Sequence, residues 1–140
     1  MRATAELRET ARGLHPAVLT QDGLDAALGH LADRSAVPVR LHVDVDRRLA
    51  PTVEATAWFV VSEGLTNVAK HSGARVATLT AELTPGGLAL EVADDGTGGA
   101  QAHPGSGLEG LTDRLAALDA RLVVDSGPAG TRLRTVIPCA

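Results

Sequence analysis

The chain is poor in aromatic residues: its 140 residues include one tryptophan, one phenylalanine and no tyrosine. Proteins that bind nucleic acid by base stacking need several exposed aromatic rings, so such a surface is not expected here. The formal net charge is −4, whereas a protein that binds the phosphate backbone needs a basic face. The composition therefore excludes nucleic acid from the expected partners.

Cysteine and long apolar runs are also scarce. The single cysteine, Cys139, has no partner for an internal disulfide, which favours a reducing compartment. No apolar run approaches the ~20 residues that span a bilayer, and the charged N-terminus lacks the apolar core of a signal peptide. We therefore expect a cytoplasmic protein with no membrane segment, most simply folded as one domain.

Hydrophobic periodicity predicts a series of helices and strands. We expect helices over 3–12, 22–35, 51–71 and 108–119. We expect strands over 37–46, 75–83, 87–93, 121–125 and 131–137. Residues 14–19 are interpreted as a connector and Asp22 as the cap of the second helix. A few helices and two hairpins predict an α/β fold, with a helical layer on one face of a mixed sheet.

The predicted helix over 51–71 carries a line of polar residues. Glu63, Asn67 and His71 are spaced by four, and Lys70 follows Asn67 by three, so these side chains share one helix face. A carboxylate can act as a base or hold metal-bound water, an amide oxygen suits Mg²⁺, and a lysine can neutralise phosphate. A solvated helix face would show the same pattern, so this block alone leaves both interpretations open.

The second polar block follows directly after a predicted strand and reads Asp94-Asp95-Gly96. Ligands often bind just beyond strand ends, where the carboxylate of Asp94 could accept a hydrogen bond from the amine of adenine. Gly96 and Gly98 would let the backbone approach a flat base. Taken alone, an Asp-Asp-Gly turn is the simpler interpretation.

The third block, Gly105-Ser106-Gly107, stands immediately before the helix that we expect to start at Leu108. Unpaired amides and the helix dipole make such a position an anion site. The preceding stretch, 96–104, is rich in glycine and alanine and could close over a ligand as a lid. A linker with a helix cap explains this block equally well. It is neither a Walker motif nor a dinucleotide-binding fingerprint.

The chain contains three motifs in a fixed order: Glu-x-x-x-Asn-x-x-Lys-His, Asp-Asp-Gly-x-Gly and Gly-x-Gly-Leu. Together they resemble the ATP-binding fold of gyrase-type topoisomerases, heat-shock chaperones, histidine kinases and mismatch-repair ATPases. The stretch 63–74 is similar, more narrowly, to the catalytic domain of nitrate-sensor and desaturase-regulator-class sensor histidine kinases. Residues 12–19 and 23–28 resemble the link between the phosphoacceptor hairpin and the catalytic domain in that class.

The resemblance implies a division of the chain and an architecture. Residues 1–20 would form the end of the helical hairpin and the linker, and residues 21–140 the ATP-binding catalytic domain. That domain would be a two-layer α/β sandwich of the Bergerat type, with helices on one face of a mixed, mostly antiparallel sheet. ATP would lie between the helices and the sheet.

The resemblance also implies roles for the first polar block. Asn67 would coordinate Mg²⁺. Glu63 would hold or activate water near the metal, or orient the attacking group. Lys70 and His71 would contact the phosphates of ATP. Glu63 and Asn67 are therefore the expected catalytic and metal-binding residues.

The other two blocks would bind the remaining parts of ATP. By the same resemblance, Asp94 would bind the adenine amine in a pocket shaped by Gly96 and Gly98. Thr131 would support the adenine end through Asp94 or water. The phosphates would be covered by Gly105, Ser106, Gly107 and Leu108.

The implied function is that of a two-component histidine kinase, but the phosphoacceptor is missing. None of the five histidines is followed by an acidic residue, as the acceptor of this class is. The chain would thus transfer phosphate from ATP to a separate phosphoacceptor helical hairpin and, through it, to a response regulator; the parent kinase could be membrane-anchored. A non-transferring nucleotide-binding module and an anti-sigma-type serine kinase are the alternatives.

Overall fold

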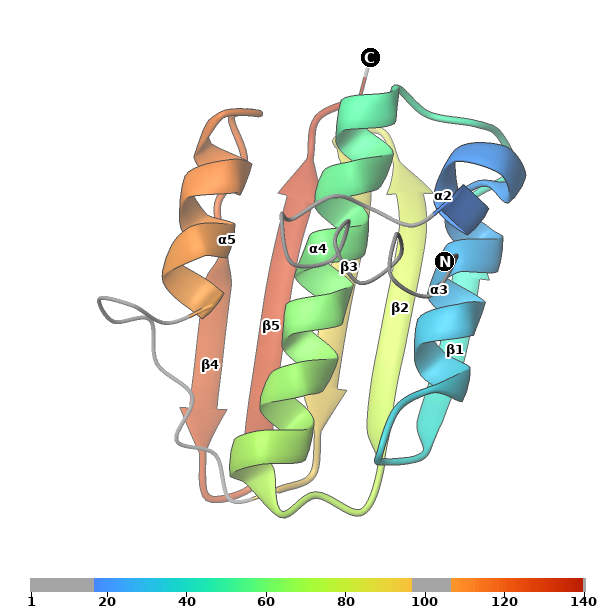
Figure 1. Ribbon diagram of the computed structural model, residues 1–140. Helices are drawn as coiled ribbons and strands as arrows, with labels where there is room; N and C mark the ends of the chain where they lie inside the picture. The colour runs from blue at the N-terminus through green and yellow to red at the C-terminus, as the bar shows by residue number, and fades with distance from the viewer. Residues whose placement is uncertain (1–16, 97–106, 140) are drawn as a thin grey trace, which may run out of the picture.

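The computed structural model describes residues 17–96 and 107–139, which form one sheet with helices on one of its faces (Figure 1). The predicted helix over 3–12 lies outside the described residues. The helices are α2 (Ala17–Asp22), α3 (Leu24–Asp33), α4 (Pro51–Asn67), the one-turn π-helix η1 (Val68–Ser72) and α5 (Gly107–Ala116). The strands are β1 (Val39–Asp44), β2 (Ala77–Thr84), β3 (Gly87–Asp94), β4 (Val123–Gly127) and β5 (Gly130–Ile137).

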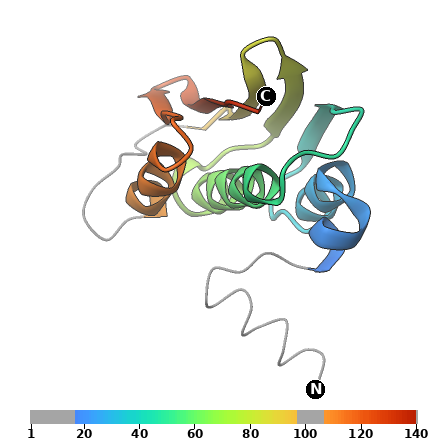
Figure 2. The same ribbon diagram turned by 90° about the horizontal axis from the view of Figure 1, so that it is seen from above.

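The five strands lie in the order β1-β2-β3-β5-β4. β1 runs parallel to β2, and the other neighbouring pairs are antiparallel. Seen from above, α3, α4 and α5 form a single layer beside the sheet, and none of the described helices lies against its other face (Figure 2). The predicted fold class, a two-layer α/β sandwich with a mixed and mostly antiparallel sheet, is confirmed.

The core lies between these two layers because the strands alternate in polarity. On β3, Leu88, Leu90 and Val92 are buried under the helices, while Ala89 and Glu91 face the open side. The central helix α4 buries the apolar stripe that its periodicity predicts. Its buried members and their continuation in η1 are Val53, Ala57, Val60, Val61, Leu65 and Val68.

Several predicted boundaries are wrong at helix ends. The predicted connector over 14–19 overlaps α2, which begins at Ala17. Gly23, not Asp22, is the N-cap of α3, and no side chain caps that helix. Gly23 has φ +93°, a left-handed conformation that glycine adopts without strain. The predicted helix over 51–71 ends as an α-helix at Asn67, where η1 takes over.

An ion pair between exposed Arg48 and buried Glu54 anchors the start of α4. Glu54, in the first turn, is only 3% exposed. Its carboxylate accepts hydrogen bonds from Arg48 Nη2 at 2.9 Å, Arg48 Nε at 3.1 Å and the Leu49 amide at 3.1 Å. Arg48 Nη2 also donates to the Thr20 carbonyl at 3.1 Å. The hydrogen bond and the charge of Glu54 raise the pKa of Arg48, and the pair joins the end of α2 to the start of α4.

Near its C-terminal end, at Gly64, α4 lies directly against β3. A Cβ atom at Gly64 would be 3.1 Å from Cβ and Cγ2 of Val92, which is closer than side chains normally pack. Glycine therefore sets the distance between the helix and the strand. Glu63 immediately precedes Gly64 on α4, so this distance also fixes how far the polar block lies from the sheet.

We expect Gly64→Val to destabilise the fold by about 1–3 kcal/mol, because the added methyl groups must displace α4 or Val92 in a packed core. Gly110→Val is the matched control: Gly110 is also helical, and a Cβ there meets nothing within 4 Å. Urea denaturation of both variants and the wild type measures the difference. Equal midpoints for Gly64→Val and Gly110→Val would show that α4 does not depend on this close approach.

Candidate functional site

The predicted site residues gather at one end of the sheet. The last turn of α4, the end of β3 and the start of β5 lie together at the lower end of the view in Figure 1. The helix α5, which follows β3 in the sequence, packs beside α4 on the side away from α3. The fold thus places the end of one strand, the start of another and the end of the central helix around a single region.

Asp94 and Thr131 are brought together by the β3–β5 pairing. Ala93 pairs with Arg132, so the next step of this antiparallel ladder sets Asp94 beside Thr131 on the helix-covered face. Both residues line a depression of about 550 Å³ formed with the β4–β5 turn. Thr131 is 7% exposed, and its hydroxyl lies 3.1 Å from Ser126 Oγ.

The backbone approaches Asp94 closely at Gly130. A Cβ atom at Gly130 would overlap the carbonyl oxygen of Asp94, and the residue has φ +136°. Only glycine fits this combination of crowding and conformation without strain. On the other side, Asp94 Oδ1 accepts a hydrogen bond from the Gly96 amide at 2.8 Å, which starts the turn that leaves β3. The backbone of Asp94 is therefore fixed by the close approach of Gly130, its carboxylate is held by the Gly96 amide, and Gly96 itself is buried.

Glu63 and Asn67 lie in the last turns of α4, and both are partly buried. Ser62 and Thr66 line the groove toward α3, so residues one position later lie about 100° around the helix, toward α5. The Nδ2 atom of Asn67 is buried and has no hydrogen-bond partner in the described part of the chain. A buried amide donor without an acceptor costs roughly 1–3 kcal/mol, which makes this atom a place where a ligand acceptor would be stabilising.

Lys70 is exposed and lines a groove of about 420 Å³ between α3 and α4, together with Arg34 and Thr66. The three-residue spacing from Asn67 to Lys70 assumes an α-helix, whereas Lys70 lies in the π-helix η1, which begins at Val68. The side chain of His71 lies outside the described residues. The phosphate-binding roles of Lys70 and His71 stay predictions.

The third block is described only at its end. Gly98, Gly105 and Ser106, with the expected lid, lie outside the described residues. Gly107 is the first residue of α5, one position before the predicted start, and the Leu108 side chain is buried in the core. Leu108 therefore fixes the start of α5 by packing, and a phosphate contact by this block stays a prediction.

Asp95 has a structural role that the sequence analysis missed. Its Oδ1 atom accepts hydrogen bonds from the Arg75 amide at 2.8 Å and the Val76 amide at 3.2 Å, just before β2. The hydrogen bonds from Val76 and Arg75 lower the pKa of the Asp95 carboxyl below its ordinary value. The partners are 19 and 20 residues away in the sequence, so no local pattern could have identified them.

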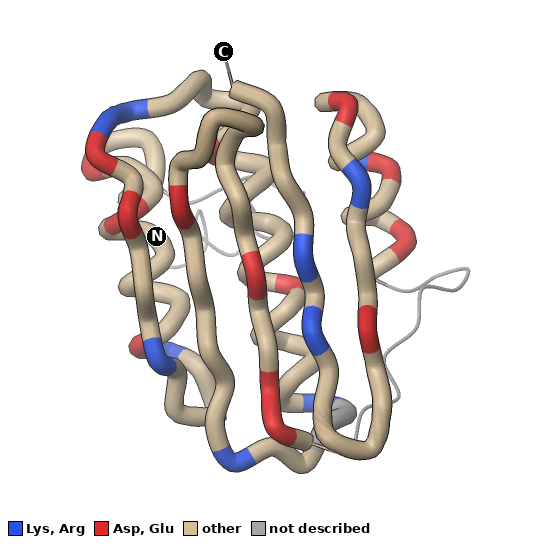
Figure 3. Tube along the Cα trace, turned by 180° about the vertical axis from the view of Figure 1, so that it is seen from behind, with Lys and Arg blue, Asp and Glu red and all other residues tan. Residues whose placement is uncertain are grey.

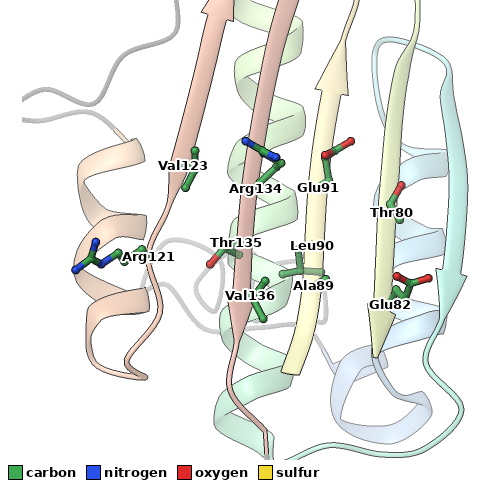
Figure 4. A pocket seen from close by; sticks show the side chains of 10 residues that line it. All are labelled: Thr80, Glu82, Ala89, Leu90, Glu91, Arg121, Val123, Arg134, Thr135 and Val136. Atoms are coloured by element: carbon green, nitrogen blue, oxygen red, sulfur yellow. The ribbon is translucent and has the colours of Figure 1, made fainter. Parts of the chain in front are cut away.

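The open face of the sheet is a different kind of surface. It carries charges of both signs (Figure 3) and a depression of about 460 Å³ lined by residues of β2, β3, β4 and β5 (Figure 4). Arg134 pairs with Asp125 at 3.0 Å and Arg132 with Glu91 at 3.8 Å across neighbouring strands. None of the predicted site residues lines this depression, so we do not place the site there.

The described residues contain neither a metal-binding cluster nor a helix that could span a membrane. Within 17–96 and 107–139, no three residues among His, Cys, Asp and Glu gather as a metal-binding cluster. In the same ranges, every helix is too short or too polar to cross a bilayer. No protein-family model matches the chain.

Known proteins similar to this chain are histidine kinases. NarS, a sensor histidine kinase of Mycobacterium tuberculosis, is 36% identical over 145 residues, covering 97% of this chain and 34% of NarS. The chain thus spans about a third of that relative. The histidine kinase domain of the blue-light-activated kinase EL346 from Erythrobacter litoralis matches with a TM-score of 0.65 and 27% identity, covering 80% of this chain and 56% of that one.

The ATP-binding domain of PrrB from Mycobacterium tuberculosis is similar to this chain in fold alone. It is 19% identical with a TM-score of 0.61, and the match covers 84% of this chain and 91% of that domain. The sequence likeness to NarS and the shared fold point to the same group of proteins. The chain is therefore homologous to the sensor histidine kinases and has the fold of their ATP-binding domain.

Proposed function

We propose that the chain binds ATP with Mg²⁺ at the sheet end occupied by Asn67, Asp94 and Thr131, and transfers the γ-phosphoryl group to a histidine on a separate helical hairpin. The observation that carries the proposal is the buried Nδ2 atom of Asn67, near the Asp94 end of the sheet, which has no hydrogen-bond partner among the residues that the structure describes. Buried polar groups in folded proteins are normally hydrogen-bonded, and a bound phosphate or metal complex would supply the missing partner.

Asn67 fits the phosphate and metal end of the nucleotide. Its amide carries both a donor and an acceptor, and rotation of the amide by 180° exchanges them. The donor can bind a phosphate oxygen, and the oxygen is the hard ligand that Mg²⁺ accepts alongside waters and phosphates. Glu63, one turn earlier on the same face, would hold a metal-bound water or orient the attacking group. When bound, Mg²⁺ would neutralise charge on the phosphates during transfer.

Asp94 fits the adenine end. Its carboxylate lies at the edge of a depression shared with Thr131, and its position is fixed by Gly130 and by the hydrogen bond to Gly96. A carboxylate accepts a hydrogen bond from the exocyclic amine of adenine, which an amide in its place would do less strongly. Thr131 already shares its hydroxyl with Ser126, so it can support Asp94 or a water without a conformational change.

The acceptor histidine would lie on another protein or another part of a longer one. His30 and His42, which the structure describes, are exposed on α3 and β1 and are followed by leucine and valine. Neither has the acidic neighbour expected of the acceptor. We therefore infer that a phosphoacceptor hairpin and a response regulator are the partners, and that transfer takes place in the cytoplasm.

Asp94→Asn is expected to weaken ATP binding at least ~10-fold, because the charged acceptor for the adenine amine is lost. Asn67→Ala should instead remove most of the affinity gained when Mg²⁺ is added. Calorimetric titration with ATP, with and without Mg²⁺, measures both effects. Asp44→Asn, exposed on the distant edge strand β1, is the control and should bind as the wild type does. Wild-type affinity in Asp94→Asn would refute the adenine role.

Phosphotransfer is tested by mixing the chain with purified hairpin domains of histidine kinases and ATP labelled at the γ-phosphate. We expect label on the hairpin that is lost in acid, as phosphohistidine is, and none when the chain is replaced by Asn67→Ala. Acid-stable label would support a serine kinase. ATP binding without transfer to any hairpin would support a non-transferring regulatory module.

A further inference from the structure

Asp94 and Asp95 are neighbours in sequence but have different partners. Asp94 Oδ1 accepts a hydrogen bond from the Gly96 amide at 2.8 Å, within the turn that follows β3. Asp95 Oδ1 bonds a distant segment, through the amides of Arg75 and Val76 at 2.8 and 3.2 Å. One carboxylate is thus available to a ligand, while the other is used inside the protein.

The segment that Asp95 holds is the connection from the polar block to the sheet. η1 ends at Ser72, β2 starts at Ala77, and only four residues lie between them. Gly73 turns this connection with φ +61°, and the Ala77 amide bonds the Pro38 carbonyl at 2.9 Å. Arg75 and Val76 precede that anchor, and in the described structure Asp95 is the side chain that bonds their amides.

The regular pairing of β2 with β3 does not extend to Arg75 and Val76. The last pair between β2 and β3 is Ala77 with Asp94, so Asp95 continues the attachment of the two strands with its side chain. Hydrogen bonds from amides to an ionised carboxylate are about twice as strong as neutral ones. Two of them on one oxygen fix the connection against the end of β3 even though Asp95 is exposed to solvent.

We propose that Asp95 is a positioning residue that holds the Asn67 end of the site at a fixed distance from Asp94. The inference rests on the proposed function, since it assigns the phosphate and metal end of ATP to Asn67 and adenine to Asp94. A ligand that spans both ends gains full affinity only when they are correctly spaced; for reacting groups, a misplacement of about 1 Å can cost as much as 10²-fold in rate. A ligand that touches only the adenine end does not depend on that spacing.

The test compares ATP·Mg²⁺ with adenosine, which lacks phosphates, in calorimetric titrations of the whole chain. We expect Asp95→Ala to weaken ATP·Mg²⁺ at least ~10-fold and adenosine less than ~3-fold. Asp95→Asn keeps an oxygen acceptor in the same place and should recover most of the ATP·Mg²⁺ affinity. If Asp95→Ala does not fold, Asp95→Ser, whose hydroxyl is too short to reach the two amides, takes its place.

A double-mutant cycle separates positioning from general damage. Asp95→Ala added to Asn67→Ala should weaken ATP·Mg²⁺ little beyond Asn67→Ala alone, because the end that Asp95 positions is already lost. Equal losses for ATP·Mg²⁺ and adenosine, or wild-type affinity of Asp95→Ala for ATP·Mg²⁺, would overturn the inference. Failure of the wild type itself to bind ATP would instead overturn the proposed function, and with it any role of Asp95 toward a nucleotide.

Discussion

The site depends first on how closely α4 lies against β3. Gly64 leaves no room for a side chain next to Val92, so the helix lies directly against the Val92 side chain at that point. Three residues later the helix ends at Asn67, and two residues after Val92 the strand ends at Asp94. This core contact sets the distance between the helix and the strand, while the hydrogen bonds of Asp95 hold the connection that follows the helix.

Glycine acts a second time where β5 begins. The carbonyl of Asp94 occupies the space that a side chain at Gly130 would need. This lets β5 start directly beside the end of β3, which places Thr131 next to Asp94 on the helix-covered face. Both close approaches remove side-chain volume near the site, and both leave the neighbouring polar groups at distances set by backbone packing.

Elements with a clear period could be predicted from the sequence. The alternation of Thr131, Leu133, Thr135 and Ile137 sets the buried face of β5, and the stripe from Val53 to Val68 sets that of the central helix. Both predictions depend on contacts that repeat along one helix or strand. Glu63 and Asn67 are candidates from their helical spacing and Asp94 from its place after a strand; the fold gathers these residues at one end of the sheet, and their roles stay predictions.

The errors depend on contacts that the local sequence does not contain. Ala17 follows a proline and was assigned to a connector, although proline is compatible with the first turn of a helix. The α2–α3 turn needs the left-handed conformation of Gly23, which a capping pattern centred on Asp22 does not reveal. The helix predicted over 51–71 changes to a π turn after Asn67, which its α-helical period does not reveal. Asp95 bonds amides 19 and 20 residues away, which only the folded chain brings near.

The two ends of α4 have complementary tasks. At its start, buried Glu54 binds Arg48, and the same guanidinium bonds the carbonyl of Thr20 at the end of α2. At its other end are Glu63 and Asn67. Because an α-helix is stiff over this length, a displacement of α2 that pulls on Arg48 would be carried to the polar block as a rigid-body shift. If α2 continues a link to a phosphoacceptor hairpin, as the resemblance of residues 12–19 implies, the orientation of that hairpin is mechanically connected to the phosphate end of the proposed ATP site.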